Sequence, residues 1–225
     1  MIRSDHIFDN RSLYEAVRMW CSVEQEERTR LMELYGDIST WDTSQVTTMF
    51  VLFERRAGFN DNISQWDVGN VVDMEGMFDL ATSFNQPHAR WNVSRVTNMA
   101  AMFHGATSFN QPIGQWDIGN VSLMDAMFSS AIAFNQPLGH WDVNQIRYLG
   151  RTLQGAVIFN QDITQWDVST AYDFECTFEG AISFRNPPIA QSSWLLSPSD
   201  CPSYLFYHCM DSMRCGRRYR HNVRT

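Results

Sequence analysis

The hydrophobic and polar positions of this chain repeat every 25 residues. Tryptophan holds this spacing five times without slippage, at Trp41, Trp66, Trp91, Trp116, Trp141 and Trp166. Five more columns keep the same register: Asp or Asn directly after each Trp, an aliphatic or small residue five positions after it, and large apolar residues eight, twelve and eighteen positions after it. A fixed period between about 20 and 50 residues is typical of solenoids and other repeat arrays. The pattern therefore predicts a stack of six near-identical units.

Each unit changes its apolar spacing along its length. In the third unit, Val96, Met99 and Phe103 are spaced like one face of a helix, and Ser94 stands where a hydroxyl caps a helix start. Gly105 comes near the end of this run, where glycine readily takes a left-handed conformation. The Phe-Asn-Gln-Pro-Ile that follows contains a proline, which cannot donate to a hydrogen-bond ladder, so it predicts only a short extended rung. We expect an α/β solenoid, leucine-rich-repeat-like, with one short helix and one short extended rung per 25-residue repeat and an N-terminal helical cap. The helical half is either regular α-helix or a looser turn.

The N-terminal residues lack the 25-residue period. Leu13, Val17 and Trp20 lie among charged residues, a pattern typical of one or two amphipathic helices. A repeat array needs its open end covered. We therefore expect residues 1–36 to be an N-terminal helical cap and residues 37–190 to be the six-repeat solenoid.

The C-terminal residues depart from the period in another way. A seventh tryptophan would fall at position 191, but Gln191 stands there and Trp194 arrives three residues late. The tail that follows holds three of the five cysteines and, from Arg214 onward, five arginines. Residues 191–225 are therefore a divergent terminal cap or a basic disordered tail, and the part from 197 onward is open to a third interpretation, a reading-frame artefact.

Charge and hydropathy narrow the possible partners. The net charge is −8, and residues 1–196 carry 12 Arg against 23 Asp and Glu, so the stack itself is acidic. An acidic surface argues against a nucleic-acid backbone as the partner, whereas a basic C-terminus suits RNA or anionic lipid, beside the plainer interpretation of a solvated tail. No run of 18 apolar residues predicts a membrane span. The first ten residues resemble no signal peptide, so export by the ordinary route is not expected unless the N-terminus lies upstream.

Three repeated columns allow both a structural and a ligand-binding interpretation. The Asp after each Trp would line up for calcium, but each unit offers one carboxylate and Asn92 interrupts the row, so turn formation is favoured. An Asn column is favoured as a ladder that satisfies buried backbone groups rather than as a ligand-facing row. The Trp column is favoured as core rather than as an exposed platform for sugars. The asparagines are Asn60, Asn85, Asn110, Asn135 and Asn160.

Residues able to do chemistry are few and scattered. The C-terminal residues with the types of a zinc site are Cys201, His208, Cys209, Cys215 and His221. Their spacings match no standard finger and no CxxC pair occurs. No His recurs in the repeat; His88 and His140 replace rung residues, which indicates drift. No GxSxG, P-loop or HExxH motif is present. We therefore expect no enzyme activity, no catalytic residues, no cofactor and no metal.

The unit W-D-V-S-x-V-T-x-M-x-x-M-F-x-x-A-x-x-F-N-Q-P-I resembles the repeat of the BspA-like leucine-rich-repeat surface proteins, a repeat also found in mycoplasma lipoproteins and in long arrays of algae and other protists. Residues 91–113 and 116–138 carry it most clearly, and residues 16–50 resemble the capping lead-in of the algal type. The likeness covers roughly residues 13–190. It implies a leucine-rich-repeat-like solenoid at a cell surface that binds proteins or matrix, and it implies no catalytic residues. The chain departs from the family in lacking the usual signal and in the drift of the units after Trp141.

Positions that vary between units are free to specify a partner. Along the rung side they form a candidate face, the two residues before each Trp: Ser64/Gln65, Ala89/Arg90, Gly114/Gln115, Gly139/His140 and Thr164/Gln165. We expect a non-catalytic repeat protein that acts as an adhesion-like binding surface for protein or surface glycan. The alternatives are a structural spacer or matrix module with no specific ligand, and a non-functional truncated array. A binding module should present a continuous apolar or single-charge patch, whereas a spacer should be uniformly polar.

Overall fold

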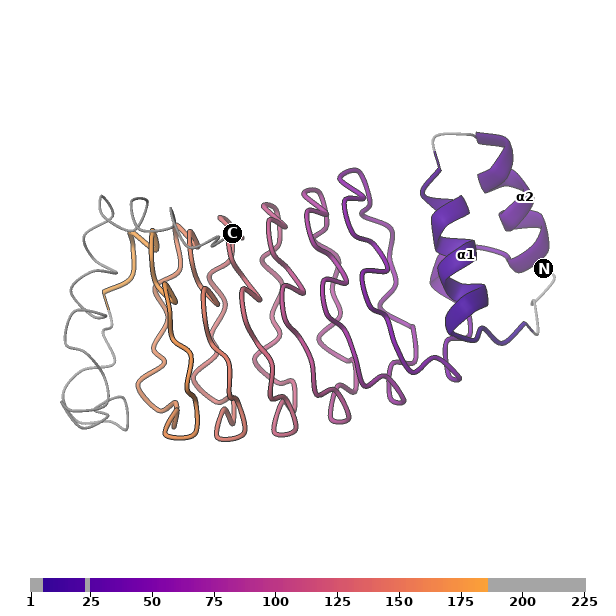
Figure 1. Ribbon diagram of the computed structural model, residues 1–225. Coiled ribbons are helices and arrows are strands. Elements are labelled where there is room, and N and C mark those ends of the chain that lie inside the picture. Colours follow the sequence, from indigo (N-terminus) through magenta and orange to yellow (C-terminus); the bar gives the residue numbers. More distant parts are fainter. Residues whose placement is uncertain (1–5, 23–24, 186–225) are drawn as a thin grey trace, which may run out of the picture.

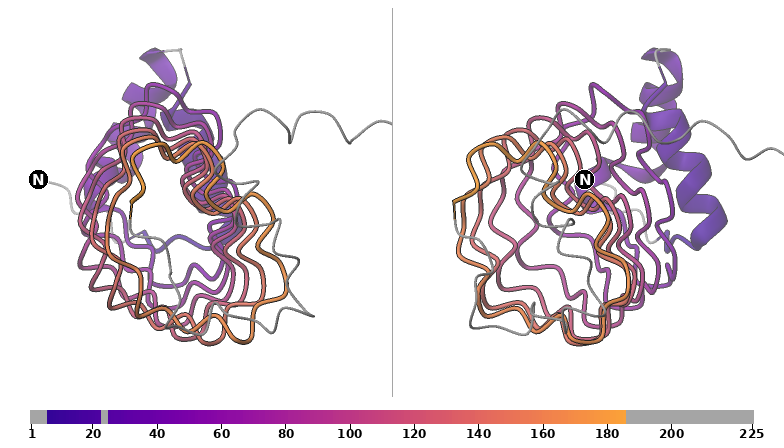
Figure 2. Two further views of the ribbon diagram at one scale, coloured as in Figure 1. Left: turned by 90° about the vertical axis from the view of Figure 1, so that its left-hand side faces the viewer. Right: turned by 60° about the vertical axis from the view of Figure 1, so that its left-hand side comes forward.

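A computed structural model describes residues 6–22 and 25–185 of the chain. Two short helices at the N-terminal end are followed by a row of stacked coils (Figure 1). Each coil begins at one tryptophan and ends before the next. Coils 1 to 6 cover residues 41–65, 66–90, 91–115, 116–140, 141–165 and 166–185. Viewed along the row, successive coils superpose as loops around a common axis (Figure 2).

The N-terminal helices are α1 (Asn10–Trp20) and α2 (Gln25–Tyr35), and a 3₁₀ turn, η1 (Ile38–Thr40), leads into coil 1. α1 begins after Asp9, whose carboxylate accepts from the backbone N–H of Ser12 at 2.8 Å. The Ser12 hydroxyl in turn accepts from the Asp9 N–H at 3.0 Å, so two helix-start donors are satisfied reciprocally. The buried face of α1 consists of Leu13, Ala16, Val17 and Trp20.

The coils contain neither an α-helix nor a strand in any residue that the structure describes, so the predicted α/β solenoid with one helix and one rung per repeat is wrong. The run with helical spacing is a chain of consecutive turns. In coil 3 the Met102 N–H donates to the Met99 carbonyl within the coil at 3.2 Å. The N–H groups of Met99 and Phe103 instead donate to the carbonyls of Leu123 and Met127 in coil 4, both at 2.9 Å. A helix uses all these donors internally, whereas here alternate donors bind the next coil.

Two residues of each turn run, four positions apart, have positive φ. In coil 3 these are Ala101 (φ 53°) and Gly105 (φ 63°). A helix needs negative φ at every position, so these two residues break it and turn the neighbouring peptides toward the adjacent coil. Gly105 does take the predicted left-handed conformation, but inside the turn run. The apolar spacing resembles a helix because the turns also return to the interior every three or four residues.

The predicted extended rung is also absent from the described coils. Neighbouring coils pair through isolated parallel bridges at a different position, seven residues after each Trp: Thr48–Asp73, Asp73–Asn98, Asn98–Leu123, Leu123–Tyr148 and Tyr148–Asp173. The Phe-Asn-Gln-Pro segment forms no bridge. Proline removes one backbone donor from it, and side-chain amides take over the contact between coils there.

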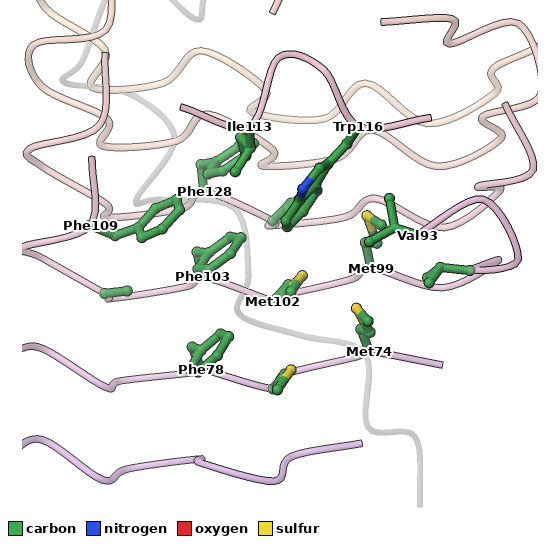
Figure 3. Close-up of a cluster of buried hydrophobic side chains, with 14 of the residues drawn as sticks. Met74, Phe78, Val93, Met99, Met102, Phe103, Phe109, Ile113, Trp116 and Phe128 are labelled. Atoms are coloured by element: carbon green, nitrogen blue, oxygen red, sulfur yellow. The ribbon is translucent and has the colours of Figure 1, made fainter. Parts of the chain in front are cut away.

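The core consists of side chains stacked from coil to coil. The ring of Phe103 lies parallel to those of Phe78 and Phe128, with centroids 5.6 and 5.8 Å apart, and 3.9 Å from that of Phe109 in its own coil. Figure 3 shows these rings and Trp116 pointing into the same interior. All six repeat tryptophans are buried, which confirms the prediction that this column belongs to the core.

Candidate interaction surface

The asparagine column forms a continuous ladder between coils. Asn85 Oδ1 accepts from the backbone N–H of Asn110 at 3.0 Å and from the side-chain amide of Gln111 at 2.9 Å. The same two bonds recur in the next two coil pairs. The predicted structural ladder is confirmed. Because these side-chain oxygens already bind the neighbouring coil, the structural interpretation is favoured over a ligand-facing row.

The Asp or Asn after each tryptophan shapes a turn. In every coil its side-chain oxygen accepts from the backbone N–H two residues on; the Asp117 carboxylate, for example, lies 3.2 Å from the Gly119 nitrogen. This confirms the turn-forming interpretation. In residues 6–22 and 25–185, no three His, Cys, Asp or Glu side chains are grouped so as to hold a metal ion.

From Trp66 to Trp166, each tryptophan also binds a backbone carbonyl 28 residues earlier, beyond the start of the preceding coil. The indole Nε1 of Trp166 donates to the Leu138 carbonyl at 2.9 Å, and that of Trp116 donates to the His88 carbonyl at 3.2 Å. A buried indole N–H needs such a partner. The column therefore supplies both apolar packing and a directional bond, and it presents no aromatic platform to the solvent.

In the candidate face formed by the two residues before each tryptophan, packing between coils determines part of the residue choice. The second residue of each pair, such as Gln115 or His140, is exposed. The first residue is half-buried in four of the five pairs. A Cβ at Gly114 would collide with the carbonyl oxygen of Pro137, and one at Gly139 would lie 2.8 Å from the carbonyl oxygen of Asp162. Close approach of the next coil explains these glycines, which leaves a single polar row as the variable part of this face.

A different exposed cluster, which the sequence analysis missed, lies on coils 5 and 6. We call Arg147, Tyr148 and Tyr172 the tyrosine patch. The side chains of Tyr148 and Tyr172 are 41% and 67% exposed, and their rings meet edge to face with centroids 5.7 Å apart. The Arg147 guanidinium lies 5.8 Å from the centroid of the Tyr172 ring, and its Nη1 donates to the Tyr172 hydroxyl at 3.4 Å.

The local backbone orients the side chains of the tyrosine patch toward the solvent. Ile146 and Leu149 are fully buried, so the two residues between them lie on the outer side of the coil. The Tyr172 N–H donates to the Arg147 carbonyl at 2.9 Å, which holds the two side chains in register on neighbouring coils. The same columns carry short side chains in coils 1 to 3: Thr47, Thr48, Val72, Asp73, Thr97 and Asn98. The change from short to aromatic side chains was therefore visible in the sequence, but the outward orientation was not.

Two carboxylates lie close to Gly150, two residues after Tyr148 in the sequence. A Cβ at Gly150 would lie 2.8 Å from Asp173 Oδ2 and 3.3 Å from Asp125 Oδ1, so this glycine leaves room for both groups. Burial raises the pKa of Asp125, and the charge of Asp173 adds to that rise. The patch thus combines aromatic rings and one guanidinium, and Asp173, which pairs with Tyr148 through a backbone bridge, adjoins it.

A second set of outward positions, sixteen and seventeen residues after each Trp, changes in the same direction. Coils 4 to 6 carry exposed isoleucines there, namely Ile132, Ile158 and Ile182. In coils 1 to 3 these positions hold Ala57, Gly58, Thr82, Ser83, Thr107 and Ser108. Large exposed apolar side chains are therefore added on the outside of the stack toward its C-terminal coils.

The remaining features considered from the sequence are the C-terminal zinc candidates and a possible membrane span. The five cysteines and histidines considered for zinc, and the whole segment 191–225, lie outside the described residues. Neither α1 nor α2, the α-helices of the described part of the chain, is long and apolar enough to cross a lipid bilayer.

Comparison with protein families gives two overlapping matches. Residues 26–131 and residues 111–212 each match the family described as "Mycoplasma protein of unknown function, DUF285". No curated protein and no solved structure matches the chain. Two matches within one chain agree with its repeated organisation, and together they span well over half of its length. The protein is therefore a member of the DUF285 family of repeat proteins.

Proposed function

We propose that this protein is a non-catalytic solenoid that binds a protein partner through the tyrosine patch. The observation that carries the proposal is the exposed pair Tyr148 and Tyr172 with Arg147, at positions where the first three coils have short side chains. Tyrosine and arginine, together with tryptophan, are enriched among the side chains that dominate binding energy at protein interfaces. Such a local concentration favours a binding module over a uniformly polar spacer.

The scaffold beneath the tyrosine patch supports this role. Arg147 and Tyr172 hold each other through the guanidinium–ring contact and the hydrogen bond, so their rotamers are partly fixed before any partner arrives. Binding then costs less side-chain entropy than it would for free side chains. The buried residues Ile146 and Leu149 anchor the same segment in the core.

The repeat's resemblance to the BspA-like surface proteins supports a binding role at a cell surface. Under this proposal the columns shared by all coils build the scaffold, and the columns that differ between coils define specificity. The spacer and truncated-array alternatives differ from it in predicting no preferred contact site.

A photo-crosslinking experiment tests the proposal. The photoreactive aromatic residue p-benzoylphenylalanine is placed at Tyr172, and in a matched control at Thr97, which is exposed in the same column of coil 3. Each purified protein is irradiated with an extract of the source cells. We expect a discrete crosslinked protein from position 172 and only background from position 97.

The identified partner is then titrated with a variant carrying Tyr148→Ala and Tyr172→Ala. Two exposed aromatic contacts at the centre of an interface predict a rise in Kd of about tenfold or more, with an unchanged melting temperature. Thr97→Ala should bind like the unmodified protein. Equal crosslinking at both positions, or an unchanged Kd, would favour the spacer.

A further inference from the structure

His88 occupies a core column that is otherwise aliphatic. Three residues before the next tryptophan, the other coils carry Ile63, Ile113, Leu138 and Ile163. The His88 side chain is only 1% exposed. It is therefore a titratable group at a position where the repeat needs an apolar one, and the proposed binding role does not use it.

Aromatic rings from three coils surround His88. Six rings have centroids between 5.0 and 6.3 Å from that of the imidazole; they belong to Phe78, Phe84, Trp91, Phe103, Phe109 and Trp116. Four of them are labelled in Figure 3. None of these rings is charged, and no charged side chain contributes to the pKa shift of His88, so no carboxylate is placed to compensate an imidazolium.

The hydrogen bonds of His88 suit only its neutral form. Nδ1 lies 2.7 Å from the Gln86 carbonyl oxygen, which accepts its proton. Nε2 is fully buried and has no hydrogen-bond partner among the described residues. A second proton, on Nε2, would place both a charge and an unsatisfied donor among aromatic rings, which is costly in a protein interior.

Burial lowers the pKa of His88 from its ordinary value of 6.5 to about 4, and the bond to Gln86 opposes this shift only in part. Between these two pH values the unfolded chain takes up a proton that the folded chain does not. The associated stability is complete above pH 6.5 and is lost progressively as the pH falls toward 4.

We propose that His88 makes the junction of coils 2, 3 and 4 an acid-sensitive point, at which the stack opens first when the pH falls below neutrality. The His88 ring contacts all three coils, and its carbonyl also accepts the indole bond of Trp116. Protonation of His88 therefore weakens both the packing of these rings and the hydrogen bond between the Trp116 indole and the His88 carbonyl.

Urea unfolding at pH 7 and pH 5 tests the energetics in three proteins: the unmodified chain, His88→Ile and His140→Gln. The first substitution installs the usual residue of the column, and the second replaces an exposed histidine with the glutamine that other coils carry. Titration of His88 should lower the folding equilibrium constant by about 20-fold between pH 7 and pH 5, because its pKa falls from 6.5 to about 4 on folding. His88→Ile should lack this loss, and His140→Gln should retain it. Equal pH dependence of His88→Ile and the unmodified chain would overturn the proposal.

Hydrogen exchange of the unmodified protein locates the opening without any variant. At pH 5, after correction for intrinsic exchange rates, we expect protection to fall first in residues 86–116, while coils 5 and 6 keep theirs. Protection lost first at either end of the stack, or evenly along it, would contradict the inference. If His88→Ile folds poorly, His88→Leu, which matches coil 4, serves in the unfolding series.

Discussion

The first coil and the inner coils meet their preceding neighbour with the same atoms, but the neighbours differ. Between coils 3 and 4, the Ser122 N–H donates to the Thr97 carbonyl at 2.9 Å. At the matching position of coil 1, the Thr47 N–H donates to the side-chain oxygen of Asn10, the first residue of α1, at 2.8 Å. The Asn10 amide nitrogen also donates to the Thr47 hydroxyl at 3.0 Å. One side-chain amide thus replaces the peptide group of a missing coil.

The glutamine column shows a second difference between the end and the interior. Gln111, Gln136 and Gln161 bind the asparagine of the preceding coil, but coil 1 has Asp61 in that position. Asp61 Oδ2 accepts from Trp20 Nε1 at 2.7 Å and from the Arg28 guanidinium at 3.1 Å, and that guanidinium stacks 4.4 Å from the Trp20 ring. The comparison teaches that this repeat is closed at its start by changing side chains in fixed columns while the coil backbone is kept.

The largest effect should come from removing a ring inside the stack. Phe103→Ala leaves a cavity between Phe78 and Phe128, and we expect a loss of about 3–5 kcal/mol in the free energy of unfolding. The matched change at the end, Phe8→Ala, removes a buried ring that stacks on Trp41 at 4.9 Å. In urea titrations followed by circular dichroism, Phe103→Ala should broaden the unfolding transition more than Phe8→Ala does. The reason is that the coils on the two sides of Phe103 become uncoupled. A sharp transition with Phe103→Ala would show that coupling does not run through this column.

A smaller effect should follow from breaking the contact between Asp61 and the two N-terminal helices. Asp61→Ala leaves the Trp20 indole and the Arg28 guanidinium without their shared acceptor, and the expected loss is about 1–2 kcal/mol since the carboxylate is partly exposed. Asp61→Asn keeps an acceptor for the indole and should cost less. Hydrogen exchange should accelerate in α1 and α2 while coil 5 is unchanged. Uniform acceleration along the chain would mean that α1, α2 and the coils unfold as one unit.

The smallest effects should come from two asparagines whose side-chain oxygens make similar hydrogen bonds but differ in solvent exposure. Asn110 is half-buried and accepts from Asn135 and Gln136, so Asn110→Ala should cost about 1–2 kcal/mol. Asn10 is exposed, and water can replace its side chain at Thr47, so Asn10→Ala should cost about 0.5 kcal/mol. Melting temperatures of the two variants give the ranking. A larger loss for Asn10→Ala would show that the end, rather than the interior, limits stability.

The sequence predicted which residues form the core better than it predicted the backbone conformation of the coils. The tryptophan, phenylalanine and asparagine columns were predictable because burial repeats with the coil whatever local structure carries it. The helix prediction failed at residues such as Ala101 and Ala126, whose positive φ values of 53° have no signature in an alanine. Gly76 has the same positive φ at the matching position of coil 2, and Gly105 has it at the second such position of coil 3, so glycine gave only a partial signal.

The candidate surface was less predictable for a related reason. Tyr148 and Tyr172 stand out as departures from the repeat, but their exposure follows from a backbone that the apolar spacing did not identify. The predicted binding face formed by the two residues before each Trp was partly wrong at Gly114 and Gly139. The next coil lies so close there that only glycine fits, and this closeness is a property of the stack rather than of one unit.

The hydrogen bonds between coils also fix how each coil is rotated about the axis of the stack. Toward the next coil, the turn run of coil 3 presents N–H donors such as those of Met99 and Phe103, whereas its asparagine side presents an acceptor, Asn110 Oδ1. The facing surface of coil 4 has the complementary order, with carbonyls opposite the turn run and the Asn135 N–H opposite the asparagine. A coil turned by half a revolution would set donor against donor and acceptor against acceptor. The pattern of hydrogen-bond donors and acceptors, backbone and side chain together, therefore favours one rotational setting, and the outward side chains take their directions from that setting.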